Sequence, residues 1–191
     1  MASSRRLGAP DAKNRTVLLD AAERLMIEKG YAAVTSRRVA DEAGLKPQLV
    51  HYYFRTMDDL FLEIFRRRAE QGLAVQAELM DAPNPLRALW EFSTSPAGVA
   101  VTMEFIAMSR HREALREEIA NYSEQFRAGQ RAALDKILDR VNLSEKIPPV
   151  VVSVLMTSLS RVLVMEESLG VTGGHAETIE LVEWVLSKFD E

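Results

Sequence analysis

The sequence predicts an all-α protein of about nine helices, and three observations support this fold class. From residue 18 onward, apolar residues recur at the three- and four-residue spacing of a helix face. Val150 to Val154 alternate like a strand, but they lie in an apolar stretch between Pro149 and Gly170 that is too long for one. The 191 residues, 47% of them hydrophobic, can bury a core without disulfides, and the chain has no cysteine.

The first helix is predicted to follow a short polar arm. Residues 1 to about 10 are small and polar, which predicts a disordered arm that ends at Pro10. The next segment carries one apolar stripe at helical spacing, and Gly30 fits the end of that helix. The stripe consists of Leu18, Ala21, Ala22, Leu25 and Met26.

Two short helices are predicted next, over 36–43 and 47–54. Thr35 or Ser36 can cap the first, and Gly44 ends it with the positive φ that a tight turn requires. Pro47 fits the first turn of the second, where its missing N–H would have no partner. Two helices joined by so short a turn predict a helix-turn-helix. Its inward-facing residues are Val39, Ala40, Ala43, Leu45, Leu49, Val50 and Phe54.

A fourth helix is predicted over 57–80. Thr56 and Asp59 have the spacing of a capping box, in which each side chain accepts from the backbone of the other. Pro83 and Pro85 then stop the helix. Its inner stripe begins with Met57, Leu60, Phe61 and Ile64.

Five further helices are predicted, over 85–94, 98–109, 113–141, 150–165 and 175–189. The helix at 150–165 is apolar nearly all round, which predicts a buried helix that also needs a partner surface beyond its own domain. Inner faces are assigned to Leu115, Ile119, Tyr122, Phe126, Ala133 and Ile137 on the long helix and to Ile179, Val182, Leu186 and Phe189 on the last.

Charge is distributed unevenly along the chain, whose net charge is -4. Residues 1–56 carry ten Lys or Arg and six Asp or Glu, which gives +4, and residues 57–191 carry fourteen and twenty-two, which gives -8. A basic head on an acidic body suggests a polyanionic partner at one end only. We therefore expect an N-terminal domain over 1–56 and a second helical domain over 57–191.

Several function classes lack the residues that they need. The absence of cysteine excludes zinc-finger, iron–sulfur and thiol-nucleophile sites. The three histidines are far apart, and no HExxH, GxSxG or glycine-rich phosphate loop is present, so we expect no enzyme, no metal and no cofactor. The first residues lack the apolar core of a signal peptide, and no run reaches the roughly 20 apolar residues of a membrane span, so we expect a cytoplasmic protein without membrane contact.

The outer face of the helix-turn-helix carries groups that suit DNA. A helix with polar and aromatic side chains near its N-terminal end fits the major groove, which admits a helix and displays a readable pattern of donors and acceptors. The outward-facing residues are Ser36, Arg37, Lys46, Pro47, Gln48, His51, Tyr52 and Arg55.

Four motifs stand in register along this segment. They are Val39-Ala40, Ala43-Gly44 at the turn, the aromatic cluster Tyr52-Tyr53-Phe54, and Leu60 in the following helix. In this pattern, which covers about a quarter of the chain, the sequence resembles the TetR family of bacterial transcriptional regulators. The resemblance implies an N-terminal three-helix DNA-binding domain and a C-terminal helical domain that binds a ligand and forms dimers.

The resemblance also implies roles for the outer residues. Ser36 and Tyr52 would contact phosphates, and Arg37 would reach a base or a phosphate. The residues that would face base edges are Lys46, Pro47, Gln48 and His51.

Two positions depart from the family pattern. His51 stands where the family usually has Tyr, and Met57 stands where it usually has a Lys that commonly touches a phosphate. Arg55, or Arg5 and Arg6 of the arm, could replace that phosphate contact. His51 can still donate to a phosphate or a base edge.

The resemblance implies a homodimer that binds a palindromic operator, is released by a small apolar effector, and acts as a repressor. The dimer would form through the last two helices, about 148–170 and 175–189, and effector binding would shift the helix at 57–80. Apolar groups on the middle helices suit an effector pocket, although core packing explains them equally well: Trp90, Phe105, Met108, Tyr122 and Phe126. The alternative is a helical protein-interaction module without specific DNA binding, which the Met57 departure favours.

Overall fold

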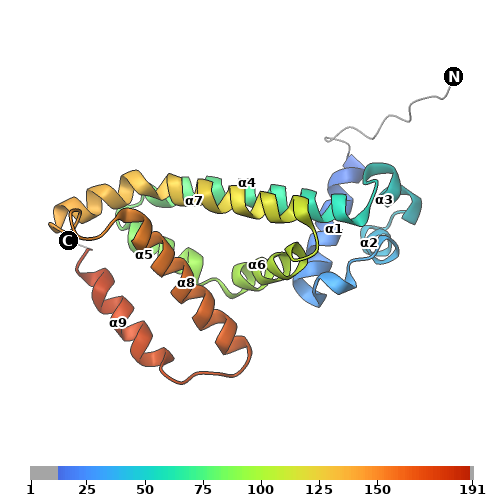
Figure 1. Cartoon of the computed structure of the whole chain (residues 1–191). Coiled ribbons are helices and arrows are strands. Elements are labelled where there is room, and N and C mark those ends of the chain that lie inside the picture. Colours follow the sequence, from blue (N-terminus) through green and yellow to red (C-terminus); the bar gives the residue numbers. More distant parts are fainter. Residues whose placement is uncertain (1–12, 190–191) are drawn as a thin grey trace. The chain divides into compact units, whose positions relative to one another are not determined.

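The computed structural model describes residues 13–189, which fold into nine α-helices and one 3₁₀ turn, with no strand in that range (Figure 1). This confirms the predicted fold class. The predicted arm at 1–10 lies outside the described residues. The elements are α1 Lys13–Lys29, η1 Tyr31–Ala33, α2 Ser36–Ala43, α3 Pro47–Tyr53, α4 Met57–Met80, α5 Pro85–Ser93, α6 Pro96–Ser109, α7 Glu113–Arg140, α8 Pro149–Ser168 and α9 His175–Ser187.

Two local features differ from the expectation. The turn η1 was not predicted, because three residues are too few to show a period. Helix α6 begins two residues before the expected Gly98, since Ser95 caps it: the Gly98 N–H donates to Ser95 Oγ at 3.4 Å and the Val99 N–H donates to the Ser95 carbonyl at 3.0 Å.

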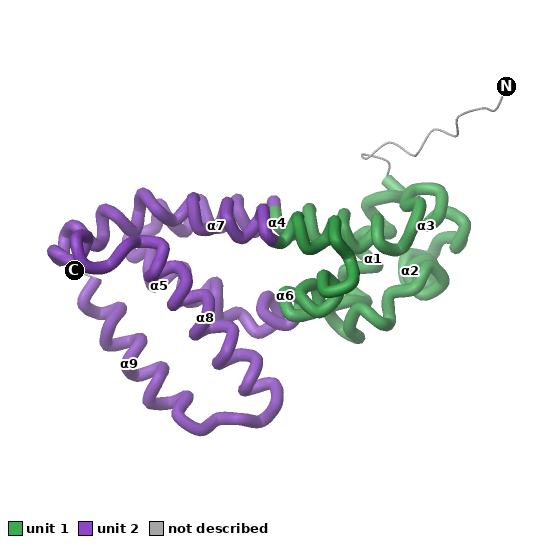
Figure 2. The backbone as a smooth tube through the Cα atoms, viewed as in Figure 1, with its two compact units in different colours: residues 1–69, 101–119 green, residues 70–100, 120–191 purple. Residues whose placement is uncertain are grey.

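The chain divides into two compact units (Figure 2). Within the described range, the first unit contains residues 13–69 and 101–119, and the second contains 70–100 and 120–189. Helices α4, α6 and α7 therefore each contribute residues to both units. The domain boundary expected at residue 56 is a division by proposed function, and it stays a prediction.

The core of the first unit contains the predicted apolar stripe of α1. All five stripe residues are buried, together with Val39, Ala40, Val50 and Phe54 of the helix-turn-helix. Leu60, Phe61 and Ile64 of α4 are buried as predicted, and the ring of Phe65 meets that of Phe105 edge to face at 5.2 Å. Contacts among α1, α2 and α3 make this a three-helix packing unit.

The core of the second unit draws on four helices. It contains Leu86 and Trp90 of α5, Leu134 and Ile137 of α7, Leu163 of α8 and Leu186 of α9. Val182 and Phe189 pack against this cluster as predicted. Ile179 does not lie on an inner face, since it is 45% exposed.

Helix α8 is buried on one side only, which corrects the expectation of a buried helix. Ser153, Ser160 and Leu163 face inward, whereas Val151, Val154, Leu155 and Val162 are exposed. Apolar residues lie on all sides of α8, but within one chain other helices pack against only one of these sides.

Helix α8 also meets the criterion for a membrane-crossing helix by length and composition alone, with a mean hydropathy of 1.5. Core helices of water-soluble proteins meet this criterion too.

Replacing Gly44 with Ala should lower the free energy of unfolding by about 1 kcal/mol, because a Cβ is disfavoured at positive φ. Gly44 has φ 64° and ψ 29°, and nothing lies within 4 Å of the position that a Cβ would occupy, so the expected loss comes from the backbone alone. Urea denaturation measures it. The control is Gly173→Ala, where the space is equally open and φ is not in the left-handed region. If both variants lost the same free energy of unfolding, the positive φ of Gly44 would not be the cause of the loss.

Candidate nucleic-acid interface

The start and the end of α2 fix the geometry of the helix-turn-helix. The Oγ1 of Thr35 accepts the N–H of Arg38 at 3.3 Å, so that Thr35 is the N-cap and Ser36, the other candidate, is the first residue of the helix. At the other end, Gly44 is left-handed and the Leu45 N–H donates to the Ala40 carbonyl at 2.9 Å. This bonding ends α2 and turns the chain toward α3.

Helix α3 is short and is anchored by its inner side. Pro47 occupies its first position, as predicted, and Phe54 ends it in an extended conformation, with its N–H donating to the Val50 carbonyl at 2.8 Å. Val50 is fully buried and Phe54 is 2% exposed. The guanidinium of Arg15 on α1 lies 5.2 Å from the centroid of the Phe54 ring, a cation–π distance. The inner side of α3 is therefore held by α1.

The predicted contact residues lie on the outside of this unit. Seven of them are exposed: Arg37, Lys46, Pro47, Gln48, His51, Tyr52 and Arg55. Ser36 is half-buried at the first position of α2. Tyr52 is 46% exposed and packs edge to face on Tyr53, which is half-buried. The structure thus gathers Lys46 to Tyr52 on one short helix and its cap, and their contact with DNA stays a prediction.

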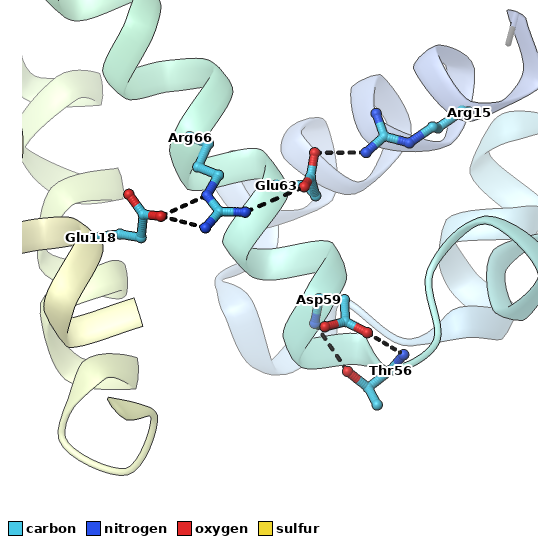
Figure 3. A network of polar contacts seen from close by, with 6 residues as sticks. All are labelled: Arg15, Thr56, Asp59, Glu63, Arg66 and Glu118. Atoms are coloured by element: carbon cyan, nitrogen blue, oxygen red, sulfur yellow. Dashed lines mark hydrogen bonds and ion pairs between the residues drawn. The ribbon is translucent and has the colours of Figure 1, made fainter. Parts of the chain in front are cut away.

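Helix α4 begins at the predicted capping box (Figure 3). The Asp59 N–H donates to Thr56 Oγ1 at 3.0 Å, and the Thr56 N–H donates to Asp59 Oδ2 at 3.0 Å. Met57, in place of the family's lysine, is half-buried. The neighbouring Asp58 accepts from Arg112 Nε at 2.6 Å.

A chain of ion pairs extends from α1 through α4 to α7 within the first unit (Figure 3). Arg15 donates to Glu63 Oε2 at 2.6 Å, and the other carboxylate oxygen of Glu63 lies 3.7 Å from Arg66. Arg66 in turn binds Glu118 of α7 through two nitrogens. Ion pairs thereby join α4 to both α1 and α7.

A second cluster binds α4 to α1 more deeply. Arg67 donates to Asp20 Oδ1 at 2.6 Å and to Glu23, and Arg68 donates to the other oxygen of Glu23. Burial lowers the pKa of Arg67, but its hydrogen bonds to Glu23 and Asp20 outweigh this effect and raise the pKa above its ordinary value. The stabilisation that depends on the charge of Arg67 is therefore fully present at neutral pH and is lost as the pH rises into strong alkali.

The connection between α1 and α2 is also held by α6. The carboxylate of Glu104 accepts the backbone N–H of Tyr31 at 2.9 Å. Neither this contact nor either ion-pair cluster was predicted from the sequence. The partners that join different helices lie 44 to 73 residues apart, and charge pairs at such separations leave no periodic signal that could have revealed them.

Replacing Glu23 with Gln should lower the free energy of unfolding by about 1 to 2 kcal/mol, because two guanidinium groups lose their shared carboxylate. Arg67 and Arg68 remain 24% and 31% exposed, so the loss should be smaller than for a fully buried pair. Chemical denaturation measures it. The control, Glu113→Gln, removes a carboxylate that is 78% exposed and should cost under about 0.5 kcal/mol. A loss no larger than this control's would show that the cluster contributes little.

The residues expected to line an effector pocket fall in both units. Phe105 and Met108 are buried in the first unit. Trp90, Tyr122 and Phe126 belong to the second, where Trp90 is part of the apolar core. The rings of Tyr122 and Phe126 are 5.8 Å apart, and Phe92 stacks on Phe126 at 6.4 Å. Their contact with an effector stays a prediction.

The comparisons with known proteins agree with this geometry. Residues 18–64, from the buried stripe of α1 to Ile64 of α4, match the model of the bacterial regulatory proteins of the tetR family. The HTH-type transcriptional repressor BepR of Brucella suis is 32% identical over 87 residues, which are 44% of this chain and 42% of BepR. The chain thus aligns with less than half of the length of that relative.

Solved structures extend the likeness to the remaining helices. A TetR-family transcriptional regulator from Mesorhizobium loti superposes with a TM-score of 0.71 at 19% identity, covering 95% of this chain and 96% of that one. The multidrug binding protein EbrR, solved in complex with ethidium, has a TM-score of 0.55 at 25% identity, covering 82% of this chain and 98% of EbrR. The segment that contains the helix-turn-helix of α2 and α3 is therefore that of the TetR family of bacterial regulatory proteins, and the remaining helices share the fold of a solved regulator of that family.

Proposed function

We propose that this chain is a ligand-responsive DNA-binding repressor that binds a palindromic operator as a homodimer. The observation that carries the proposal is the two-sided character of α3. Val50 and Phe54 anchor one side in the first unit, while Lys46, Gln48 and His51 are exposed on the other. A helix held in this way can enter the major groove.

Each predicted contact residue has a role in the proposed complex. Lys46, Pro47, Gln48 and His51 face base edges, where Gln pairs best with adenine and Lys with guanine. Ser36, Arg37, Tyr52 and Arg55 contact the flanking backbone, with Arg37 also able to reach a base. The +4 charge of residues 1–56 favours a polyanion at this end of the chain, which is the proposed DNA-binding domain.

The proposed dimer forms through α8 and α9. Their exposed apolar side chains in the described range are Val150, Val151, Val154, Leu155, Val162, Ile179, Leu181, Trp184 and Val185. Apolar groups of this size and number on adjacent helices need a partner surface. A two-fold axis would present two copies of α3, which matches a palindromic site.

The remaining helices, in the proposed domain 57–191, bind a small effector with an apolar body. EbrR, solved with ethidium, shows that a related fold accepts an aromatic compound. Effector binding would shift α4, whose residues belong to both units, and so lower the affinity for the operator. The protein would act in the cytoplasm, without catalysis, cofactor or membrane contact.

Selection of bound duplexes from random DNA tests this function. The expected result is enrichment of a palindrome whose half-sites lie about one helical turn apart. Failure to enrich any sequence would favour the alternative, an interaction module that has lost DNA binding.

A salt titration of the selected duplex separates the two functions further. A protein that neutralises several phosphates loses affinity steeply as salt rises, with a linear fall of log affinity against log salt. An interaction module would give no DNA isotherm to titrate.

A further inference from the structure

The turn between α6 and α7 lies beside the first turn of α4. Arg112 of this turn donates from Nε to Asp58 Oδ1 at 2.6 Å, and its guanidinium lies 5.6 Å from the centroid of the Phe61 ring. Asp58 and Phe61 are three residues apart and therefore lie on the same side of α4. One arginine thus holds the α6–α7 turn against the start of α4, within the first unit.

Helices α4 and α7 begin at the same end of the first unit. Arg112, directly before α7, pairs with Asp58 at the start of α4. Further along both helices, Glu118 of α7 pairs with Arg66 of α4 (Figure 3). Two helices whose contacts advance together in this way run in the same direction. Because α3 ends only a few residues before α4 begins, the α6–α7 turn lies at the end of the unit that carries the helix-turn-helix.

The α6–α7 turn is held on both sides along the chain. The Arg112 N–H donates to the Ser109 carbonyl at 3.3 Å, which closes the turn. Earlier on α6, the carboxylate of Glu104 accepts the Tyr31 N–H at 2.9 Å, so that α6 is fastened to the connection between α1 and α2. These contacts hold the backbone of Arg110 beside the three-helix unit.

Arg110 is an exposed cation in this turn. It forms no ion pair with any residue of the described range 13–189. The carboxylates that adjoin the turn have partners of their own: Asp58 pairs with Arg112, Glu113 lies 3.6 Å from Arg116, and Asp59 accepts the Thr56 N–H. Arg55, which leads into α4, is also exposed, whereas Met57 contributes no charge. The start of α4 is therefore accompanied by two exposed arginines, one from each side of the chain break between the helix-turn-helix and α7.

We propose that Arg110 binds a phosphate of the operator, as a backbone contact from outside the helix-turn-helix. A guanidinium suits this role, because its parallel N–H donors match the oxygens of a phosphate and its charge releases counterions from the duplex. Such a contact fixes the position of the protein on the duplex and reads no sequence. The inference rests on the proposed DNA-binding function, and it adds a DNA contact from the proposed domain 57–191.

The salt dependence of operator binding by the full-length protein tests this contact. Fluorescence anisotropy with the selected duplex is measured over a series of salt concentrations. Arg110→Gln should weaken binding about 3- to 30-fold at physiological salt, for one exposed charge pair lost in each subunit of the proposed dimer. It should also reduce the slope of log affinity against log salt by about 2, since two phosphates are no longer neutralised. Arg110→Lys keeps the charge and should keep the slope.

Two comparisons separate a phosphate contact from a general loss of charge or of stability. The control Arg131→Gln removes an arginine of α7 that is 80% exposed, and it should leave the affinity and the slope unchanged. Arg110→Gln should weaken binding to a scrambled duplex by about the same factor as binding to the operator, because phosphates carry no sequence information. Its Tm should equal that of the parent, since Arg110 is exposed.

Replacing single phosphates of the operator with neutral methylphosphonates locates the contact. The parent protein should lose affinity at one phosphate in each half of the operator where Arg110→Gln loses none. If every replacement affects the parent and the variant equally, or if Arg110→Gln keeps the parent's slope, the proposal is wrong. An equal fall of the slope in Arg131→Gln would assign the effect to net charge and would also overturn it.

The remaining outcomes distinguish this contact from its alternatives. A lower Tm of Arg110→Gln with an unchanged slope would show that Arg110 only stabilises the C-terminal end of α6, where a cation is favourable, and would overturn the proposal. A parent protein that binds no duplex would contradict the proposed function and this contact together. A parent that binds its operator, with a variant of unchanged slope, would contradict this contact alone.

Discussion

The variant Lys46→Ala/Gln48→Ala should bind its operator at least about 100-fold more weakly than the parent protein. Each good contact between a side chain and a base edge contributes about 1 to 3 kcal/mol of discrimination, and both side chains lie at the exposed start of α3. The loss should concentrate on the specific site, with binding to unrelated DNA reduced much less. Fluorescence anisotropy with the operator and with a scrambled duplex at fixed salt measures both affinities.

The matched control for this variant is Gln125→Ala/Arg140→Ala. It removes one amide and one cation from exposed positions of α7. It should bind the operator as the parent does. Both double variants should also unfold at the parent's temperature, because none of the four side chains is buried. A fall in operator affinity of the same size in both would show that the effect comes from net charge and not from α3.

The variant Leu155→Glu/Leu181→Glu should be monomeric and should lose operator binding by at least about 100-fold. These leucines are 62% and 59% exposed on α8 and α9, the helices of the proposed dimer. Burying two carboxylates in each half of that interface costs more than the lost apolar contact alone. A monomer reads one half-site without the gain of about 100-fold or more that a linked second site provides. Analytical ultracentrifugation gives the mass, and anisotropy gives the affinity.

The control for this variant places one carboxylate on another exposed apolar position. Val75 of α4 is 38% exposed, and Val75→Glu should keep the parent's mass and affinity. Circular dichroism should show the same helix content in both variants. If Leu155→Glu/Leu181→Glu remained a dimer with normal operator affinity, α8 and α9 would not be the dimer surface.

The sequence predicted the local structure of the helix-turn-helix closely, because the responsible signals act over a few residues. Thr35 caps α2, Gly44 ends it, and Thr56 with Asp59 forms the box that starts α4. Each of these interactions connects atoms within one helical turn, so residue type and spacing are sufficient to specify it. The residues on the outer face of α3 could be predicted in the same way, because once the inward-facing residues of a helix are assigned, the remaining ones must face outward.

Contacts between distant segments could not be predicted in this way. The pairing of Glu23 with Arg67 and Arg68 joins helices 44 and 45 residues apart, and Glu104 reaches Tyr31 across 73 residues. A charged residue on a helix surface has no periodic signature of its partner. The prediction that Ile179 is buried was wrong for a related reason. Ile179 fits an apolar stripe, but the stripe does not show on which side a neighbouring helix will pack.

The sequence also could not show which aromatic residues pack in the core and which are available to bind a ligand. Trp90 and Tyr122 are both aromatic residues on middle helices, yet Trp90 fills a core cluster, whereas Tyr122 is half-buried and packs against the ring of Phe126.

Cross-linking of the native protein to an operator that carries 5-bromodeoxyuridine in place of thymine tests the central claim most directly. The bromine occupies the major groove where the thymine methyl group lies, so irradiation joins it to the side chains that read that groove. Mass spectrometry of the tryptic digest should place the cross-link in the peptide from Val39 to Arg55, which contains all of α3. Cross-links found only in peptides from residues 57–191 would contradict the claim that the outer face of α3 binds the duplex.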